Sequence, residues 1–345
     1  MMSMMSMMSM MSLATRYLGL QLAHPIVAAA SPLTATLDGM RRLEDAGAAA
    51  VVMSSLYEEQ IRAEDTAYAL YTEHGSNSQA EATSYFPELP DYDSGVSGHL
   101  ETLQRASKAL DIPVIASLNG TTAEGWTGHA RALEQAGAAA IELNVYSVPF
   151  DLGTSGAEVE RRTVEVVRQV SATVQIPVAI KLMPYFSSMP HMAAELVRAG
   201  AGGLVLFNRF YAPDIDLTTL AVTRTLPLST AAELPLSLVW IALLSRRVEC
   251  SLAASRGVET EVEVVKYLLT GADVVMTASA LLRHGPEHIA TMRGGLERWL
   301  EENAYDSVDA IRGLKDATHV EHVDALLRAQ YVAALTEYVP GKLIQ

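Results

Sequence analysis

The 345-residue chain has one cysteine, Cys250, and few basic residues, and each scarcity excludes a class of protein. A single thiol cannot build a disulfide framework, nor can it supply the four ligands of an iron–sulfur cluster, and we expect no metal site. Lysine and arginine number 25 against 40 aspartates and glutamates, which gives a net charge of −15 and a pI of about 5.0. Without runs of basic residues, nucleic acid and anionic membranes are poor partners.

Long apolar runs are also missing. No stretch approaches the roughly 18 apolar residues that a membrane span requires, so we expect a cytoplasmic protein without a span. Residues 1–12 repeat Met-Met-Ser four times and lack the basic and apolar regions of a secretory signal, so we interpret residues 1–14 as a disordered leader. The whole chain is 50% hydrophobic, with a mean hydropathy of +0.17, which is enough for a large core.

One phrase recurs four times along the chain. A helical stretch ends at a glycine, small residues follow, and a β-rich run then ends in a serine, threonine or asparagine. Glycine commonly ends helices in the left-handed conformation, and short apolar runs are typical of strands that are buried on both faces. Such repeats are the α-to-β junctions of one large fold of alternating strands and helices. The four glycines are Gly47, Gly137, Gly200 and Gly271.

Extending the pattern predicts an α/β protein, a (β/α)₈ TIM barrel over residues 15–304. A small hairpin at 15–22 is expected ahead of the first strand, and residues 305–345 are expected to form a C-terminal helical extension. The long break at 56–97, after the second strand, is rich in aromatic residues, and we interpret it as a lid over the barrel mouth. The eight strands are expected at 25–31, 49–54, 113–119, 138–143, 177–184, 203–208, 249–255 and 273–278.

Polar residues stand where these strands end, which is the rim that carries the active site in such barrels. The most telling is Lys181, because a lysine in an apolar strand is costly to bury unless an anion or a dipole compensates its charge. Three roles remain open for it: a Schiff-base nucleophile, a counter-charge to an anionic cofactor, or a core lysine paired with Glu142. The other rim residues are Ser54, Asn119, Asn144, Ser147 and Asn208.

A phosphate site is indicated at the last two strands. Ser255, Arg256 and Gly257 precede one helix, and Ala278 and Ser279 precede a short one. The loops after these strands are the usual phosphate site of the fold, and the first N–H groups of a helix carry about half a positive charge. Together with the lysine and the amides, this predicts a phosphate-bearing ring cofactor across the barrel mouth.

These residues resemble the dihydroorotate dehydrogenase family over most of Leu18 to Glu302. The specific phrases are ELNVYS at 142–147, KLMPYF at 181–186, and the segment 256–286. The resemblance implies an FMN flavoprotein of pyrimidine biosynthesis, an oxidoreductase acting on CH–CH groups. Its substrate would be dihydroorotate or a related small cyclic acid, and hydride would pass to flavin N5. An external electron acceptor or redox partner is expected, and we expect a homodimer.

The resemblance also implies roles for individual residues. Ser147 matches the catalytic base, and Lys181 matches the lysine beside the flavin. The candidate catalytic residues are therefore Ser147, Lys181 and Asn144. The candidate cofactor-binding residues are Ser54, Asn119, Asn144, Lys181, Asn208, Ser255, Arg256, Gly257, Ala278 and Ser279.

Three positions depart from the family. Met53 replaces a lysine at the end of the second strand, and Ala82 and Pro149 stand where the family has substrate-binding amides. Each lost hydrogen bond is worth about 1 to 1.5 kcal/mol, so we expect orotate to bind weakly. Two alternatives stay open: a non-catalytic FMN-binding partner of a redox complex, and a Schiff-base lyase that uses Lys181.

Overall fold

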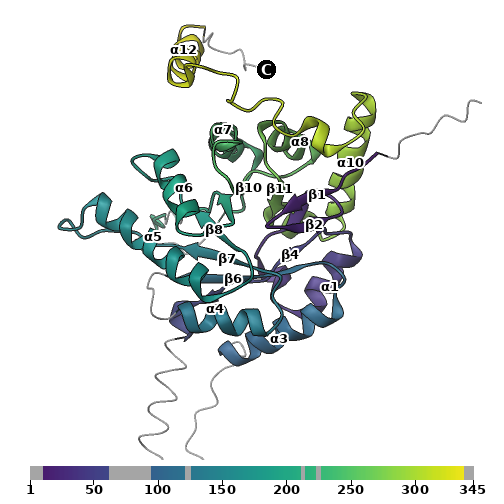
Figure 1. Cartoon of the computed structure of the whole chain (residues 1–345), viewed down its shortest axis with the longest axis vertical. Helices are drawn as coiled ribbons and strands as arrows, with labels where there is room; N and C mark the ends of the chain where they lie inside the picture. The colour runs from purple at the N-terminus through teal and green to yellow at the C-terminus, as the bar shows by residue number, and fades with distance from the viewer. Residues whose placement is uncertain (1–10, 62–94, 121–125, 211–213, 223–226, 338–345) are drawn as a thin grey trace, which may run out of the picture.

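The computed structural model describes residues 11–61, 95–120, 126–210, 214–222 and 227–337. Within them, eight parallel strands pair in sequence and close into a barrel (Figure 1). The pairings of β11 with β3 and of β4 with β6 complete the circle, which confirms the (β/α)₈ TIM barrel. The strands are β3 (Ile26–Ala28), β4 (Val51–Val52), β6 (Val114–Gly120), β7 (Ala140–Val145), β8 (Val178–Leu182), β9 (Gly203–Leu206), β10 (Ser251–Ser255) and β11 (Val274–Thr277).

Helices cover the outside of the barrel because their apolar residues pack against the outward-facing strand residues. The glycines that precede the strands have positive φ, as expected, and they also sit in close contacts. A Cβ atom on Gly137 would lie 2.6 Å from Ser107 Oγ, and one on Gly200 would lie 2.9 Å from Ser171 Cβ. The covering helices are α1 (Leu37–Asp45), α3 (Gly95–Ala109), α4 (Trp126–Gln135), α5 (Gly156–Thr173), α6 (Met189–Arg198), α7 (Leu234–Leu244), α8 (Glu261–Thr270) and α10 (His288–Glu302).

Two elements differ from the sequence expectation. Helix α7 spans Leu234–Leu244 and not 236–246, the range that the sequence predicts, because Pro235 occupies its first turn, where no backbone N–H is needed. A two-residue strand, β5 (Leu56–Tyr57), pairs with β6 beyond the barrel and was not foreseen. Most of the predicted lid, residues 62–94, lies outside the described residues.

The interior of the barrel is filled by small and β-branched side chains, such as Ala140, Ala179 and Val205. Its amino-terminal end is closed by the predicted hairpin of β1 (Thr15–Tyr17) and β2 (Leu20–Leu22). Tyr17 is fully buried, and burial together with the Glu142 carboxylate raises the pKa of its hydroxyl. With this end closed, the opposite end is the open mouth of the barrel.

The C-terminal segment first follows the barrel and then leaves it. Ser12, which falls in the predicted leader at 1–14, pairs with Ser307. Helix α11 (Val308–Ile311) follows and buries Val308 and Ile311. Helix α12 (Val323–Thr336) lies away from the barrel and has no buried residue (Figure 1). No helix in the described ranges is both long enough and apolar enough to span a bilayer.

Candidate active site

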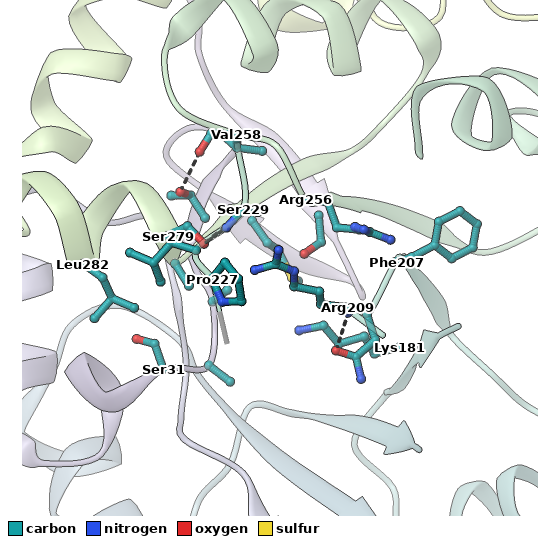
Figure 2. Close-up of a pocket in the computed structure, with 18 of the residues that line it drawn as sticks. Ser31, Lys181, Phe207, Arg209, Pro227, Ser229, Arg256, Val258, Ser279 and Leu282 are labelled. Atoms are coloured by element: carbon teal, nitrogen blue, oxygen red, sulfur yellow. Dashed lines mark hydrogen bonds between the residues drawn. The ribbon is translucent and has the colours of Figure 1, made fainter. Parts of the chain in front are cut away.

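A cavity of about 250 Å³ opens at the carboxyl ends of β3, β8, β9, β10 and β11 (Figure 2). It therefore lies on the rim where the sequence placed the site. Short side chains form its β3 side, while charged and hydroxyl side chains line the rest. The polar lining residues are Ser31, Lys181, Asn208, Arg209, Ser229, Ser255, Arg256, Thr277 and Ser279, and Ala278 also lines it.

Lys181 reaches this cavity from β8 while it forms a buried ion pair. Its Nζ lies 3.2 Å from Glu142 Oε1 on the neighbouring strand, and the two side chains are 11% and 2% exposed. Glu142 Oε2 has no hydrogen-bond partner among the described residues. The sequence left three roles open for Lys181. The structure shows the ion pair with Glu142 that one of these roles requires. It compensates the lysine charge in the barrel interior.

The amides continue the same row. Asn119, Asn144 and Lys181 are partners in register on β6, β7 and β8. Asn208 Nδ2 donates a hydrogen bond to Asn144 Oδ1 at 2.9 Å, and the Arg209 N–H donates to Asn208 Oδ1 at 2.8 Å. These two bonds fix the orientation of the Asn208 amide and connect Asn144 to the cavity.

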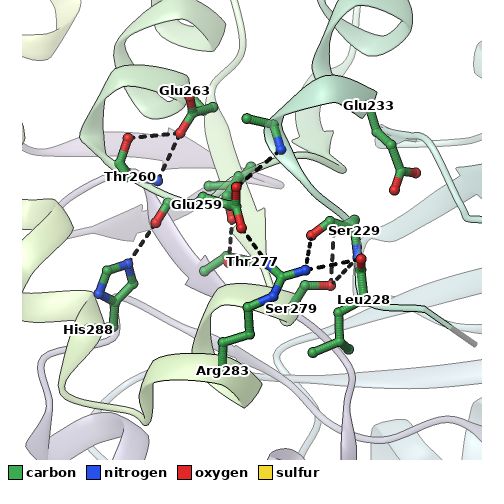
Figure 3. A network of polar contacts seen from close by, with 12 residues as sticks. Leu228, Ser229, Glu233, Glu259, Thr260, Glu263, Thr277, Ser279, Arg283 and His288 are labelled. Atoms are coloured by element: carbon green, nitrogen blue, oxygen red, sulfur yellow. Dashed lines mark hydrogen bonds and ion pairs between the residues drawn. The ribbon is translucent and has the colours of Figure 1, made fainter.

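The opposite wall is held by contacts between distant parts of the chain (Figure 3). The backbone N–H and the hydroxyl of Ser229 both bond to Ser279 Oγ, at 3.0 and 2.9 Å. Arg283 on α9 (Ser279–His284) donates to the carbonyl oxygens of Leu228 and Ser229 and pairs with Glu259 at 2.5 Å. The loop after β9 is thereby fastened to the loops after β10 and β11.

A triad of charges borders the cavity between these walls. Arg256 Nη2 lies 2.6 Å from Glu233 Oε2, and Arg209 Nη2 lies 3.2 Å from Glu233 Oε1. Two guanidinium groups share one carboxylate, so the triad carries a formal charge of +1. The sequence interpretation missed Arg209, Glu233 and Ser229. The only signal was the length of the loop at 209–235, since long loops are often functional.

Several predicted residues lie elsewhere. Ser147 is exposed and lines a second cavity, between the loop after β7 and α5, together with Pro149. Gly257, with φ +67°, packs against the backbone of Leu234. In the part of the chain that the structure describes, the predicted residues that do not line the Lys181 cavity are Ser54, Asn119, Asn144, Ser147 and Gly257. Most of the predicted cofactor residues are thus together, and the predicted base is apart from them.

The donors of the cavity fit a ligand that carries a phosphate and a planar ring. Arg256 supplies positive charge beside the hydroxyls of Ser229 and Ser279. Arg256 Nε is buried and has no hydrogen-bond partner within the described ranges, so it can donate to a ligand. Charge-assisted bonds of this kind are the usual means of holding a phosphate.

Comparison with known proteins agrees with this chemistry. The family model "Dihydroorotate dehydrogenase" matches residues 92–300, which is more than half of the chain. The chain belongs to the dihydroorotate dehydrogenase family. This confirms the resemblance of the sequence motifs and makes the protein an oxidoreductase of the type that acts on CH–CH groups. Members of this family are flavoproteins, typically with FMN.

Two relatives illustrate the range of similarity. The putative dihydroorotate dehydrogenase A (fumarate) of Aeropyrum pernix is 31% identical over 221 residues, which are 62% of this chain and 69% of the relative. The catalytic subunit of dihydroorotate dehydrogenase B (NAD(+)) of Methanothermobacter thermautotrophicus is 26% identical over 317 residues, 88% of this chain and 98% of the relative. The second alignment extends the similarity over nearly the whole chain.

Proposed function

We propose that the protein is an FMN-dependent oxidoreductase that removes hydride from a CH–CH unit of dihydroorotate or a related small cyclic acid. The observation that carries the proposal is the cavity at the barrel mouth, where Lys181 and Arg256 stand among hydroxyl and amide donors. When bound there, FMN would supply the hydride acceptor, flavin N5.

Two groups of residues would hold this cofactor. Arg256, Ser255 and Ser279 offer a guanidinium and two hydroxyls to the phosphate, on the loops that usually bind phosphate in this fold. Lys181 and Asn208 serve the ring end, and Glu142 keeps the Lys181 ammonium in place. Ser54, Asn119, Gly257 and Ala278 support these loops and strand ends; Asn144 also orients Asn208.

Ser147 is proposed as the base that accepts the substrate proton. It follows Asn144 by three residues, on the loop that leaves β7. Because its side chain is exposed and lines the second cavity, the proposal requires this loop to carry Ser147 to the mouth when substrate binds. A serine hydroxyl is a weak base, so a relay must then remove its proton.

Electrons would leave the protein for an external acceptor or redox partner. Several relatives are named as the catalytic subunit of an NAD(+)-linked dihydroorotate dehydrogenase, and a catalytic subunit implies a companion. We place the protein in the cytoplasm as a homodimer, and its acidic surface supports free solubility.

A second candidate, a non-catalytic FMN-binding partner of a redox complex, is favoured by the separation of Ser147 from the Lys181 cavity. The Schiff-base lyase is disfavoured. A nucleophilic lysine must lose its proton, whereas the ion pair with buried Glu142 uses the protonated amine.

The test is anaerobic mixing of the purified, FMN-loaded protein with dihydroorotate while the flavin absorbance is followed. Bleaching of the oxidised flavin is the expected result. Loaded protein that is not reduced by dihydroorotate or by other small cyclic acids would favour the non-catalytic candidate. Colourless protein that cannot be reconstituted with FMN would contradict the proposed function altogether.

A further inference from the structure

We propose that Arg209 binds the carboxylate of the substrate and so determines which acids the site accepts. This inference rests on the proposed function, since it assigns the substrate contact at the same site. Arg209 directly follows Asn208 at the end of β9 and lies beside Lys181 in the cavity (Figure 2).

The first support is that Arg209 is held in position yet remains accessible. Its backbone N–H donates to Asn208 Oδ1 at 2.8 Å, and its Nη2 lies 3.2 Å from Glu233 Oε1. The side chain is 27% exposed, against 16% for Arg256 and 11% for Lys181. A ligand that enters from the mouth can therefore reach the Arg209 guanidinium without breaking its support.

The second support is charge. Glu142 compensates Lys181, and Glu233 lies closer to Arg256 than to Arg209, at 2.6 against 3.2 Å. Among the cations that line this cavity in the described structure, Arg209 thus has the least compensated charge. The planar fork of a guanidinium matches the two oxygens of a carboxylate, which a lysine ammonium cannot do.

The third support is the shape of the surroundings. Phe210 follows Arg209 in the chain, and its ring meets the ring of Tyr185 edge-on, with centroids 5.4 Å apart. Across the mouth, Met53 at the end of β4 is 1% exposed and brings no charge. The carboxylate of a flat acid would therefore find its cationic partner, Arg209, on the β9 side.

The assignment also bears on the selectivity of the site. With an arginine present, the site would recognise the carboxylate more strongly than the ring edge. We therefore expect selectivity for the charge of the acid and tolerance of its ring.

The experiment titrates the flavin absorbance of FMN-loaded protein with orotate and with orotamide, which has a neutral carboxamide in place of the carboxylate. The parent should prefer orotate. R209Q should bind orotate about 10- to 100-fold more weakly, the range for a lost charge-assisted hydrogen bond, and orotamide nearly as before. R198Q removes an arginine from an exposed ion pair on α6 and should behave as the parent.

Three results would overturn the assignment. R209Q could keep the preference for orotate over orotamide. The FMN-loaded parent could bind neither compound, or bind both equally well. R209Q could lose FMN, which would make Arg209 a cofactor ligand. If R209Q does not fold, R209K decides: it keeps the charge without the fork and should show an intermediate loss of orotate affinity. Absence of FMN from the parent is a separate result, and it concerns the proposed function.

Discussion

The two halves of the barrel mouth are built differently. On the side of β8 to β11 and β3, the walls of the cavity are joined by contacts such as Ser229 with Ser279 and Arg283 with Glu259. On the side of β4 to β7, the loop that carries Ser147 exposes apolar residues to solvent. Phe150 and Leu152 of this loop are 91% and 103% exposed. Among the described residues, the first half closes around the Lys181 cavity, whereas the second half, with its exposed loop, is open.

The difference has a physical cause. Contacts in the first half join residues 24 to 55 positions apart in the sequence, so they tie several loops to one another. In the loop after β7, Asp151 bonds locally, to the Gly153 N–H and the Thr154 hydroxyl. A loop held by local bonds opens at little cost, as substrate-binding segments do. Glu142 and Lys181, on β7 and β8, stand where the two halves meet.

The largest expected effect tests the open half. Ser147→Ala should keep FMN bound but slow reduction of the flavin by substrate about 10²- to 10⁴-fold, the usual loss of a general base. Stopped-flow absorbance measures it, and Ser155→Ala, which removes the N-cap of α5, is the control for changes in the loop. Reduction at the parent rate would leave Ser147 as a loop residue only.

The second prediction concerns the junction of the halves. Glu142→Ala leaves the Lys181 ammonium buried without its partner, which should lower the free energy of unfolding by about 3 to 5 kcal/mol. Glu195→Ala breaks the exposed pair with Arg198 and should cost less than about 1 kcal/mol. Urea unfolding gives both values. Equal effects would mean that the Glu142 pair is as dispensable as a surface one.

The third prediction tests the cofactor half. Arg256→Gln should weaken FMN binding about 10- to 100-fold, because one charge-assisted contact to the phosphate is lost. Flavin fluorescence quenching measures the affinity. Arg246→Gln, which removes an arginine paired with Asp316 outside this cavity, should bind FMN as the parent does. Unchanged affinity in Arg256→Gln would place the phosphate elsewhere.

The smallest effect belongs to α5, which follows the open loop. Hydrogen bonds from Arg161 and Arg162 lower the pKa of Glu158 to about 2. A lowered pKa contributes stability above the unfolded value, near 4.5, and this contribution is lost as the pH falls toward 2. Glu158→Gln should therefore reduce the melting temperature slightly at pH 7 and not at pH 2. A difference that persists at pH 2 would point to a cause other than charge.

Much of the barrel was predictable because its signals are local. Helix-ending glycines such as Gly137, and apolar runs between them, depend on neighbouring residues only. The triad of Arg209, Glu233 and Arg256 was not predictable, because ion pairs between residues 23 or 24 positions apart produce no periodic pattern in the sequence. The separation of Ser147 from Lys181 was missed for a related reason, since a strand end fixes where a loop starts and not where it leads.

A crystal structure of the protein after reconstitution with FMN would show whether FMN lies in the cavity of the closed half. We expect the phosphate between the loops of Arg256 and Ser279, with the ring beside Lys181. Density for the flavin at the Ser147 cavity, or a chain that takes up no FMN at all, would contradict it.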